Sequence, residues 1–188
     1  ILRILREYVI ASKHIRFEGD NYSEAWKKDA QSRGLKMITN TPEALDLYRS
    51  RAAEMLFTQT GIYTKRELKA FFEVLLHNYE SIIDIEARTL HTMIQTQVLP
   101  VVLEYQNNIM RHIKNALAIG LPKNSLGMQY TLVKKLNGHV NKLQKLLDTL
   151  EASRTKALNY KLLRQRAKAY RTQVRPLFAE IRHSADTL

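Results

Sequence analysis

Six histidines and a few groups of carboxylates are the residues of this sequence that could carry acid–base or metal chemistry. No two histidines stand four residues apart, the spacing at which two imidazoles on one helix face bind zinc. We therefore interpret each histidine as a surface or core-edge residue. The six are His14, His77, His91, His112, His139 and His183.

Three acidic residues in the middle of the chain are candidates for general acid–base catalysis. Asp84 and Glu86 are two residues apart, so on a helix they point to different sides and do not converge on one proton or metal. Glu80 and Asp84 share a helix face, where salt bridging along the helix or exposure to solvent explains them. The sequence also contains no GxSxG, P-loop or dinucleotide fingerprint. We therefore predict no catalytic, cofactor-binding or metal-binding residue.

The stretch FEGDNYSEAW, residues 17–26, combines further acids with the only tryptophan. Glu18, Asp20 and Glu24 are the ligands that a small metal or phosphate site would use. A calcium loop, however, needs alternating oxygen ligands, a terminal bidentate glutamate and a central glycine at fixed positions, and Gly19 does not fit them. We therefore favour a structural role for this stretch.

That structural role consists of a turn, a helix cap and an aromatic cluster. Gly19, Asp20 and Asn21 are typical turn residues, and Asn21 or Ser23 can cap the helix that follows. The aromatic side chains are expected to form a plug against neighbouring helices. They are Phe17, Tyr22 and Trp26.

Lysine and arginine concentrate in the last third of the chain. Residues 121–188 hold fourteen basic and four acidic residues, and residues 152–179 hold eight basic residues and no acid. An acidic protein or subunit is favoured as a partner over nucleic acid, because no phosphate loop, recognition-helix pattern or interleaved aromatic residues accompany the charges. A solvated coiled-coil face explains the same charges without a partner. The candidate partner-binding face consists of Arg154, Lys161, Arg164, Lys168, Arg171 and Arg175.

The acidic, histidine and basic residues described above are expected to lie on helices. Only six glycines and four prolines, the residues that most often end a helix, occur in the whole sequence. The first part of the chain predicts helices over residues 1–13, 23–34 and 41–57, with an extended linker over 35–40. Gly34 and Gly61 mark the ends of two helices. Thr41 before Pro42 marks the start of one helix, and a capping box of Thr64 with Glu67 marks the start of the next.

One long helix is predicted from residue 64 to residue 119, with a kink near Pro100 and a turn at residues 120–122. Two heptad patterns follow, separated by a polar stretch around residues 152–155, and they predict an antiparallel coiled-coil hairpin that Pro176 bends. The heptad positions, which we interpret as core, are Leu136, Val140, Leu143, Leu147, Leu150, Tyr160, Leu163, Ala167, Tyr170, Val174, Leu177 and Ile181.

The predicted fold class is therefore all-α: an elongated helical bundle with a long Pro-kinked helix and a C-terminal antiparallel helical hairpin. We expect one helical domain with three parts. These are short helices over residues 1–61, the long kinked helix over 62–120 and the basic hairpin over 121–188.

Composition bounds the class of protein. A chain of 188 residues with 45% hydrophobic content can bury a core. The absence of cysteine excludes disulfides and thiolate chemistry and suits the cytoplasm, and no apolar run approaches the ~20 residues of a membrane span. A helical pattern begins at Ile1 without a cap, so we expect a segment of a longer protein.

Several blocks of the sequence, in order, resemble the C-terminal region of type III glutamine synthetase. The resemblance is strong over about the first 110 residues and continues in architecture thereafter. The blocks are IRFEGDNYSEAWKKDAQSRGL (15–35), TNTPEALDLY (39–48), LFTQTGIYTKREL (56–68), LLHNYESIIDIEARTLHTMIQTQVLPVV (75–102) and VRPLFAEIRHSADTL (174–188).

The resemblance implies a parent enzyme that joins ammonia to glutamate with ATP and a divalent metal, Mg or Mn, in an assembly of stacked six-membered rings. In that family the nucleotide, metal and glutamate sites lie in the domain upstream, so no catalytic residue carries over to this chain. The implied role is a helical extension that supports assembly or buttresses the catalytic domain. Its implied partners are that domain and sister subunits. The alternative is an independent helical module whose basic hairpin binds an acidic partner or nucleic acid.

Overall fold

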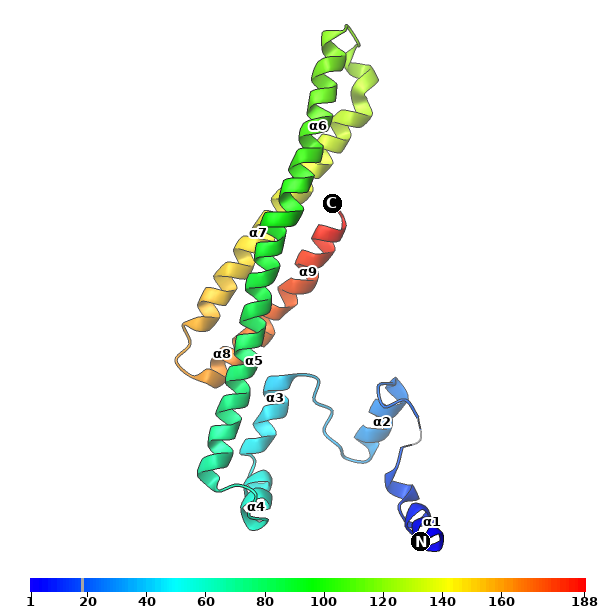
Figure 1. The fold of residues 1–188 in the computed structure, drawn as a ribbon, viewed down its shortest axis with the longest axis vertical. Coiled ribbons are helices and arrows are strands. Elements are labelled where there is room, and N and C mark those ends of the chain that lie inside the picture. The colour runs from blue at the N-terminus through cyan, green and yellow to red at the C-terminus, as the bar shows by residue number, and fades with distance from the viewer. Residues whose placement is uncertain (18) are drawn as a thin grey trace. The chain divides into compact units, whose positions relative to one another are not determined.

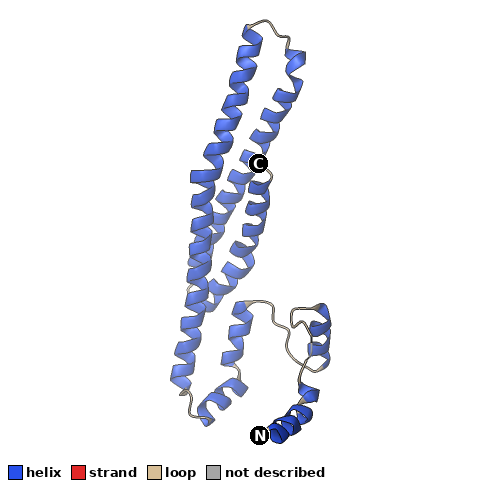
Figure 2. Ribbon diagram, turned by 45° about the vertical axis from the view of Figure 1, so that its right-hand side comes forward, coloured by secondary structure: helices blue, strands red, loops and turns tan. Residues whose placement is uncertain are grey.

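The computed structural model describes residues 1–17 and 19–188, and this part of the chain consists of helices and connecting segments without a strand (Figure 2). It folds as two compact units, Ile1–Thr39 and Asn40–Leu188. The predicted all-α class is confirmed. Within the same described residues, none of the helices combines the length and hydrophobicity needed to cross a bilayer.

The first unit has two α-helices whose ends follow local capping rules. They are α1 (Leu2–Ala11), which is followed by a 3-10 turn (Lys13–Ile15), and α2 (Glu24–Ser32). The Ser23 hydroxyl accepts a hydrogen bond from the Trp26 backbone N–H at 3.2 Å, so Ser23 is the cap of α2. Gly34 follows the helix end with a φ of 76°, the left-handed conformation predicted for it.

The stretch FEGDNYSEAW forms a turn with a smaller aromatic cluster than predicted. The Asp20 carboxylate accepts a hydrogen bond from the Tyr22 backbone N–H at 2.9 Å, which closes the turn. Phe17 and Trp26 contact each other with ring centroids 4.8 Å apart. Tyr22 is 91% exposed because it lies in the turn itself, so its inclusion in the plug was wrong. Glu18 lies outside the described residues.

The second unit begins with two short helices where one was predicted. They are α3 (Thr41–Leu45), which continues as a 3-10 turn (Asp46–Arg49), and α4 (Arg51–Gln59). The single-helix prediction fails at Ser50, whose backbone is extended and whose hydroxyl accepts a hydrogen bond from the Ala53 N–H at 3.1 Å. Because this hydroxyl satisfies a free N–H of a helix start, a new helix begins there. Asn40, and not Thr41, caps α3.

The long helix is confirmed and is interrupted only by a π turn. Its parts are α5 (Lys65–Met93), the π turn (Ile94–Val98) and α6 (Leu99–Ala118). The predicted capping box is present, since the Thr64 hydroxyl accepts from the Glu67 N–H and the Glu67 carboxylate accepts from the Thr64 N–H. The π turn ends two residues before Pro100. A widened turn there accommodates a residue that lacks an N–H and crowds the preceding turn.

The C-terminal hairpin consists of a long helix and an interrupted return helix. Its parts are a 3-10 turn (Lys123–Leu126), α7 (Gly127–Leu158), α8 (Leu163–Ala169), a second π turn (Tyr170–Val174) and α9 (Arg175–Asp186). The predicted break around residues 152–155 was wrong, and the turn falls at residues 159–162. The helix continues because Leu150 and Ala157, seven residues apart, keep its buried seam unbroken. Pro176 again follows a π turn by two residues.

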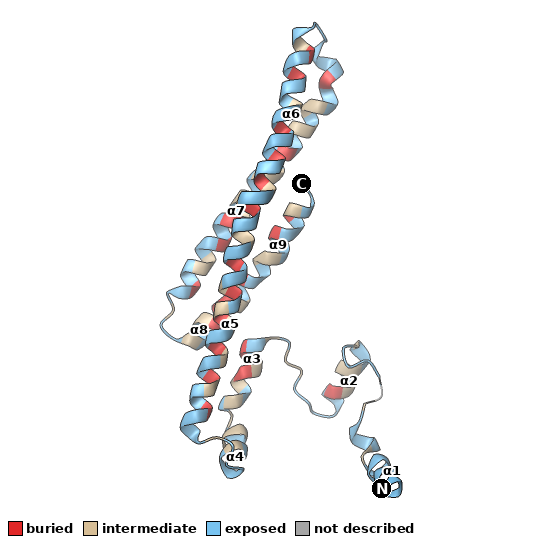
Figure 3. Ribbon diagram, viewed as in Figure 1, coloured by how far each residue is buried: buried red, intermediate tan, exposed pale blue. Residues whose placement is uncertain are grey.

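Within the second unit the long helix, α7 and the α8–α9 helix run in alternating directions side by side (Figure 1). α8 packs on α5, and α7 packs first on α6 and then on the second π turn and α9. The main core lies where three helices meet. Buried positions recur along the ribbons of these helices in Figure 3. The main core confirms the heptad interpretation with Leu143, Leu147, Leu150, Tyr170, Val174 and Ile181, each at most 1% exposed.

Candidate functional site

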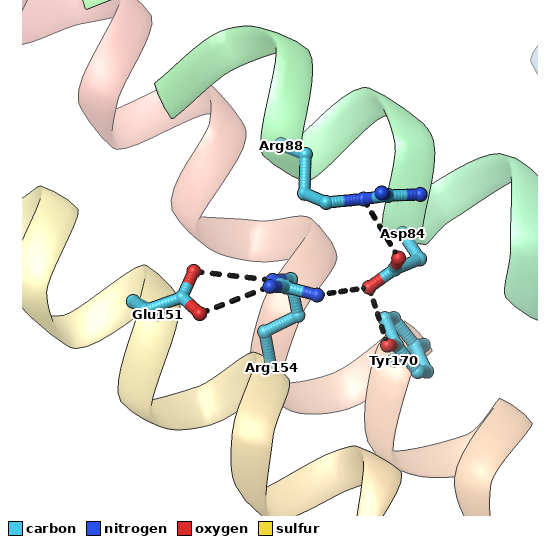
Figure 4. A network of polar contacts seen from close by, with 5 residues as sticks. All are labelled: Asp84, Arg88, Glu151, Arg154 and Tyr170. Atoms are coloured by element: carbon cyan, nitrogen blue, oxygen red, sulfur yellow. Dashed lines mark hydrogen bonds and ion pairs between the residues drawn. The ribbon is translucent and has the colours of Figure 1, made fainter. Parts of the chain in front are cut away.

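A polar network joins three helices inside the second unit (Figure 4). Asp84 on α5 lies at its centre. Its Oδ1 accepts hydrogen bonds from Arg154 Nη1 of α7 and from the Tyr170 hydroxyl of the second π turn, both at 2.7 Å. Its Oδ2 lies 3.0 Å from Arg88 Nε. On the other side, Arg154 donates two hydrogen bonds to the Glu151 carboxylate, at 2.9 and 3.1 Å.

Burial and pairing fix the protonation states of this network. The side chains of Asp84 and Arg154 are 17% and 16% exposed. Burial pushes the pKa of Asp84 upward, but hydrogen bonds from Arg154 and Tyr170 outweigh it and hold the pKa below its ordinary value. Burial, with the bond to Asp84, raises the pKa of Tyr170. At neutral pH Asp84 is therefore an ionised acceptor and Tyr170 a protonated donor.

The structure explains the central carboxylates only partly as predicted. The bridge along the helix is present between Asp84 and Arg88. The other two partners of Asp84, and the partner of Glu80, come from other helices. Glu80 is 8% exposed at its side chain and lies 3.4 Å from Arg166 Nε. Solvent exposure was thus the wrong explanation for these two acids. Glu80 contacts Arg166 of α8, and Asp84 contacts Tyr170 of the second π turn. With these partners the carboxylates hold helices together.

Three arginines of the basic stretch are engaged in ion pairs within the fold. Arg154 pairs with Asp84, Arg166 with Glu80, and Arg164 Nε donates to Asp46 Oδ1 at 2.7 Å. The candidate face of six residues is therefore divided. Arg154 is turned into the bundle, Arg164 is exposed but paired, Lys161, Lys168 and Arg175 are exposed, and Arg171 is half-buried.

A groove of about 970 Å³ lies at the base of the second unit, and we call it the basal groove. It is bounded by α3 and its 3-10 turn, by the first part of α5 and by α8. Half of the candidate basic face lines it, namely Arg164, Lys168 and Arg171, whereas Arg154, Lys161 and Arg175 do not. Sequence reasoning missed the groove because its other charged residues come from α3 to α5, more than ninety positions earlier.

No metal site is formed by the residues at 1–17 and 19–188, where no three histidine or acidic side chains gather closely enough to hold an ion. The six histidines are exposed or half-buried, as interpreted from the sequence. Glu80 and Asp84, the pair of acids that shares a helix face, are occupied by arginines. These residues do not fit a divalent metal or the phosphates that accompany one.

Comparison with known proteins identifies the family. The glutamine synthetase C-terminal domain family matches residues 1–116. The chain belongs to this family. It is 32% identical to a glutamine synthetase of Bacteroides fragilis over all of its length and 26% of that protein's, and 27% identical to one of Butyrivibrio fibrisolvens over 99% of the chain and 26% of that protein.

A third relative in the glutamine synthetase family is the type-3 glutamine synthetase of Dictyostelium discoideum. It is 31% identical over 81% of the chain and 22% of that protein. The predicted resemblance to the C-terminal region of type III glutamine synthetase is confirmed. The chain spans about a quarter of the length of the relatives it matches. Their alignments extend into the hairpin, beyond the residues matched by the family.

Proposed function

We propose that this chain is the non-catalytic C-terminal helical domain of a type III glutamine synthetase and that it supports assembly or buttresses the catalytic domain. The observation that carries this proposal is α1, an amphipathic helix without a single buried residue. A helix of only ten residues is marginal in water unless its apolar face packs on something.

The apolar stripe of α1 is broad and exposed. Leu5, Tyr8 and Val9 follow one another at helical spacing and are 55%, 72% and 49% exposed. Arg6 and Glu7 lie on the other side of the helix. The stripe supports packing on another domain, for which the catalytic domain of the same protein is the proposed partner.

The second unit also offers apolar side chains outside its core. On α5, Ile82 and Ile85 are 55% and 54% exposed, and on α6, Val101 and Tyr105 are 65% and 53% exposed. Such side chains are typical of surfaces that pack in an assembly. Sister subunits in a ring-type homo-oligomer are the proposed partners for this surface.

The proposed parent reaction is the ATP-dependent joining of ammonia to glutamate, with Mg or Mn as the metal. ATP and metal would bind outside this chain, because the acids considered as candidates for such chemistry, Glu80 and Asp84, are paired with arginines. Nucleic acid is not favoured as a partner, since Arg154, Arg164 and Arg166 already neutralise carboxylates of the same fold.

A pair of substitutions on α1 in the full-length protein tests the proposal. Leu5→Asp places a charge on the apolar stripe, whereas Ile10→Asp places the same charge at an exposed position on the opposite side of the helix. We expect Leu5→Asp to lower the melting temperature or the oligomer size, measured by calorimetry and light scattering, and Ile10→Asp to resemble the wild type. A Leu5→Asp protein that assembles, melts and turns over normally contradicts the proposed role.

Deleting residues 121–188 from the full-length protein tests the hairpin separately. Oligomer size or thermal stability should change before the active-site chemistry does. If the shortened protein assembles and melts normally and keeps full activity, the hairpin has no supporting role.

A further inference from the structure

The basal groove holds more positive charge than its own acids neutralise. Two of its cations are occupied, since Lys65 lies 2.7 Å from Glu54 and Arg164 pairs with Asp46. Four more basic side chains line it without an ion-pair partner in the described part of the chain, against two such acids. The four are Arg49, Lys69, Lys168 and Arg171, and the two acids are Glu43 and Glu73.

The unpaired cations come from different walls of the groove. Lys69 belongs to α5 and stands one turn before Glu73. Lys168 lies on α8, and Arg171 lies three residues later in the second π turn. The two helices pack side by side. A ligand in the groove can therefore meet positive charge from both sides.

Arg171 gives a second indication of a missing acceptor. The residue is half-buried, and its Nε is a buried donor without a hydrogen-bond partner among the described residues. Buried donors in folded proteins are nearly always paired. Because Arg171 also lines the groove and no carboxylate of the described residues pairs with it, the part of its guanidinium that faces the groove is suited to bind an anion.

The composition of the groove favours a small ligand over a protein partner. The cores of protein interfaces are depleted in Lys, Glu and Asp, whereas these residues make up much of the groove lining. A hollow of about 970 Å³ also lies within the size range of small-molecule sites, roughly 300 to 1,000 Å³. Two of its apolar lining residues, Phe72 and Leu76, are buried, at 5% and 1% exposed.

We propose that the basal groove binds a small anion that carries two or more phosphate or carboxylate groups. One group is held by Lys168 and Arg171 and another by Lys69. Glu73 opposes this binding and restricts the position of the negative groups. The site is independent of α1 and of the proposed assembly role, so either proposal can fail without the other.

Calorimetric titration of the full chain with pyrophosphate and, separately, with citrate tests this proposal. The variant Lys69→Gln with Lys168→Gln removes two exposed cations of the groove. The matched control, Lys156→Gln with Lys161→Gln, removes two exposed cations that do not line it. We expect at least about tenfold weaker binding for the groove variant and less than about twofold for the control.

A third variant keeps the test decisive if the paired lysine changes disturb folding. Glu73→Gln should strengthen binding of the same anion, because it removes an opposing charge at an exposed position. Saturable binding of pyrophosphate alone identifies a phosphate ligand, and of citrate alone a carboxylate ligand. Equal weakening by the groove and control variants, or no saturable binding of either anion, overturns the proposal.

Discussion

The base and the tip of the second unit differ in the number of helices that surround their core residues. At the base, α5, α7 and the α8–α9 helix enclose the main core and the Asp84 network. At the tip, the cluster of Ile113, Ala116 and Leu126 is formed only by α6, α7 and the turn between them. Two helices leave more of each core side chain next to solvent than three helices do. The local stability of this unit should therefore decrease from base to tip.

The largest effect is expected at the centre of the base. Leu147 is fully buried, so Leu147→Ala removes apolar contacts and leaves a cavity that three helices cannot easily close. We expect a loss of about 3 to 5 kcal/mol in the free energy of unfolding, measured by urea denaturation. Met128→Ala, at a position 74% exposed, is the control and should change stability little. Similar losses for both variants would contradict a core centred on the base.

The next largest effect is expected in the polar network. Arg154→Met leaves the Asp84 carboxylate in a partly buried place without its partner from α7, and we expect a loss of about 2 kcal/mol. Arg182→Met breaks the pair with Asp186, whose two side chains are 82% and 67% exposed, and should cost roughly 0 to 0.5 kcal/mol. Denaturation of both variants at neutral pH provides the measurement. Equal losses would mean that the network is as weak as a surface pair.

A smaller effect is expected at the tip. Ile113→Ala should lower the free energy of unfolding by only about 1 to 2 kcal/mol, because a two-helix site can relax around the lost side chain. Hydrogen exchange sharpens the same comparison. Amides of the tip should exchange by local opening at free energies below those of α7 near Leu147. Uniform protection along α7 would remove the distinction between base and tip.

The smallest effect is the pH dependence of the Asp84 network. Because the folded pKa of Asp84 is held below its ordinary value, the ionised network stabilises the protein above that value. This stabilisation is lost as the pH falls through the folded pKa. Asp84→Asn should therefore show a shallower loss of stability with acid than the wild type, measured as melting temperature against pH. Parallel curves for the two proteins would assign the acid sensitivity to other carboxylates.

Local signals in the sequence predicted most of the fold. The heptad positions, the glycines at helix ends and the capping box of Thr64 and Glu67 each act within a few residues, so their consequences are visible in the sequence itself. Ser50 was missed because a serine starts a helix only when the chain before it is extended. The end of α7 was misplaced because polar residues were given more weight than the seam from Leu150 to Ala157.

The candidate site was much less predictable, because its contacts are not local. Arg154 and Asp84 are seventy positions apart, and Tyr170 and Asp84 eighty-six. Tyr170 was correctly interpreted as a core residue, and the only further signal was that a buried tyrosine hydroxyl needs a partner. Charge density alone could not separate Arg154, which is turned inward, from Lys161, which is exposed.

Each of the two π turns changes the direction in which the side chains beyond it point, in the long helix and in the return helix. A π turn holds one more residue than an α-turn, so the helix beyond it is rotated by roughly 100° relative to an uninterrupted α-helix. The face that α5 turns to α8 is thereby uncoupled from the face that α6 turns to α7. Deleting one residue from Ile94–Val98 would restore a regular helix. The same deletion would rotate every side chain of α6 away from its present neighbours.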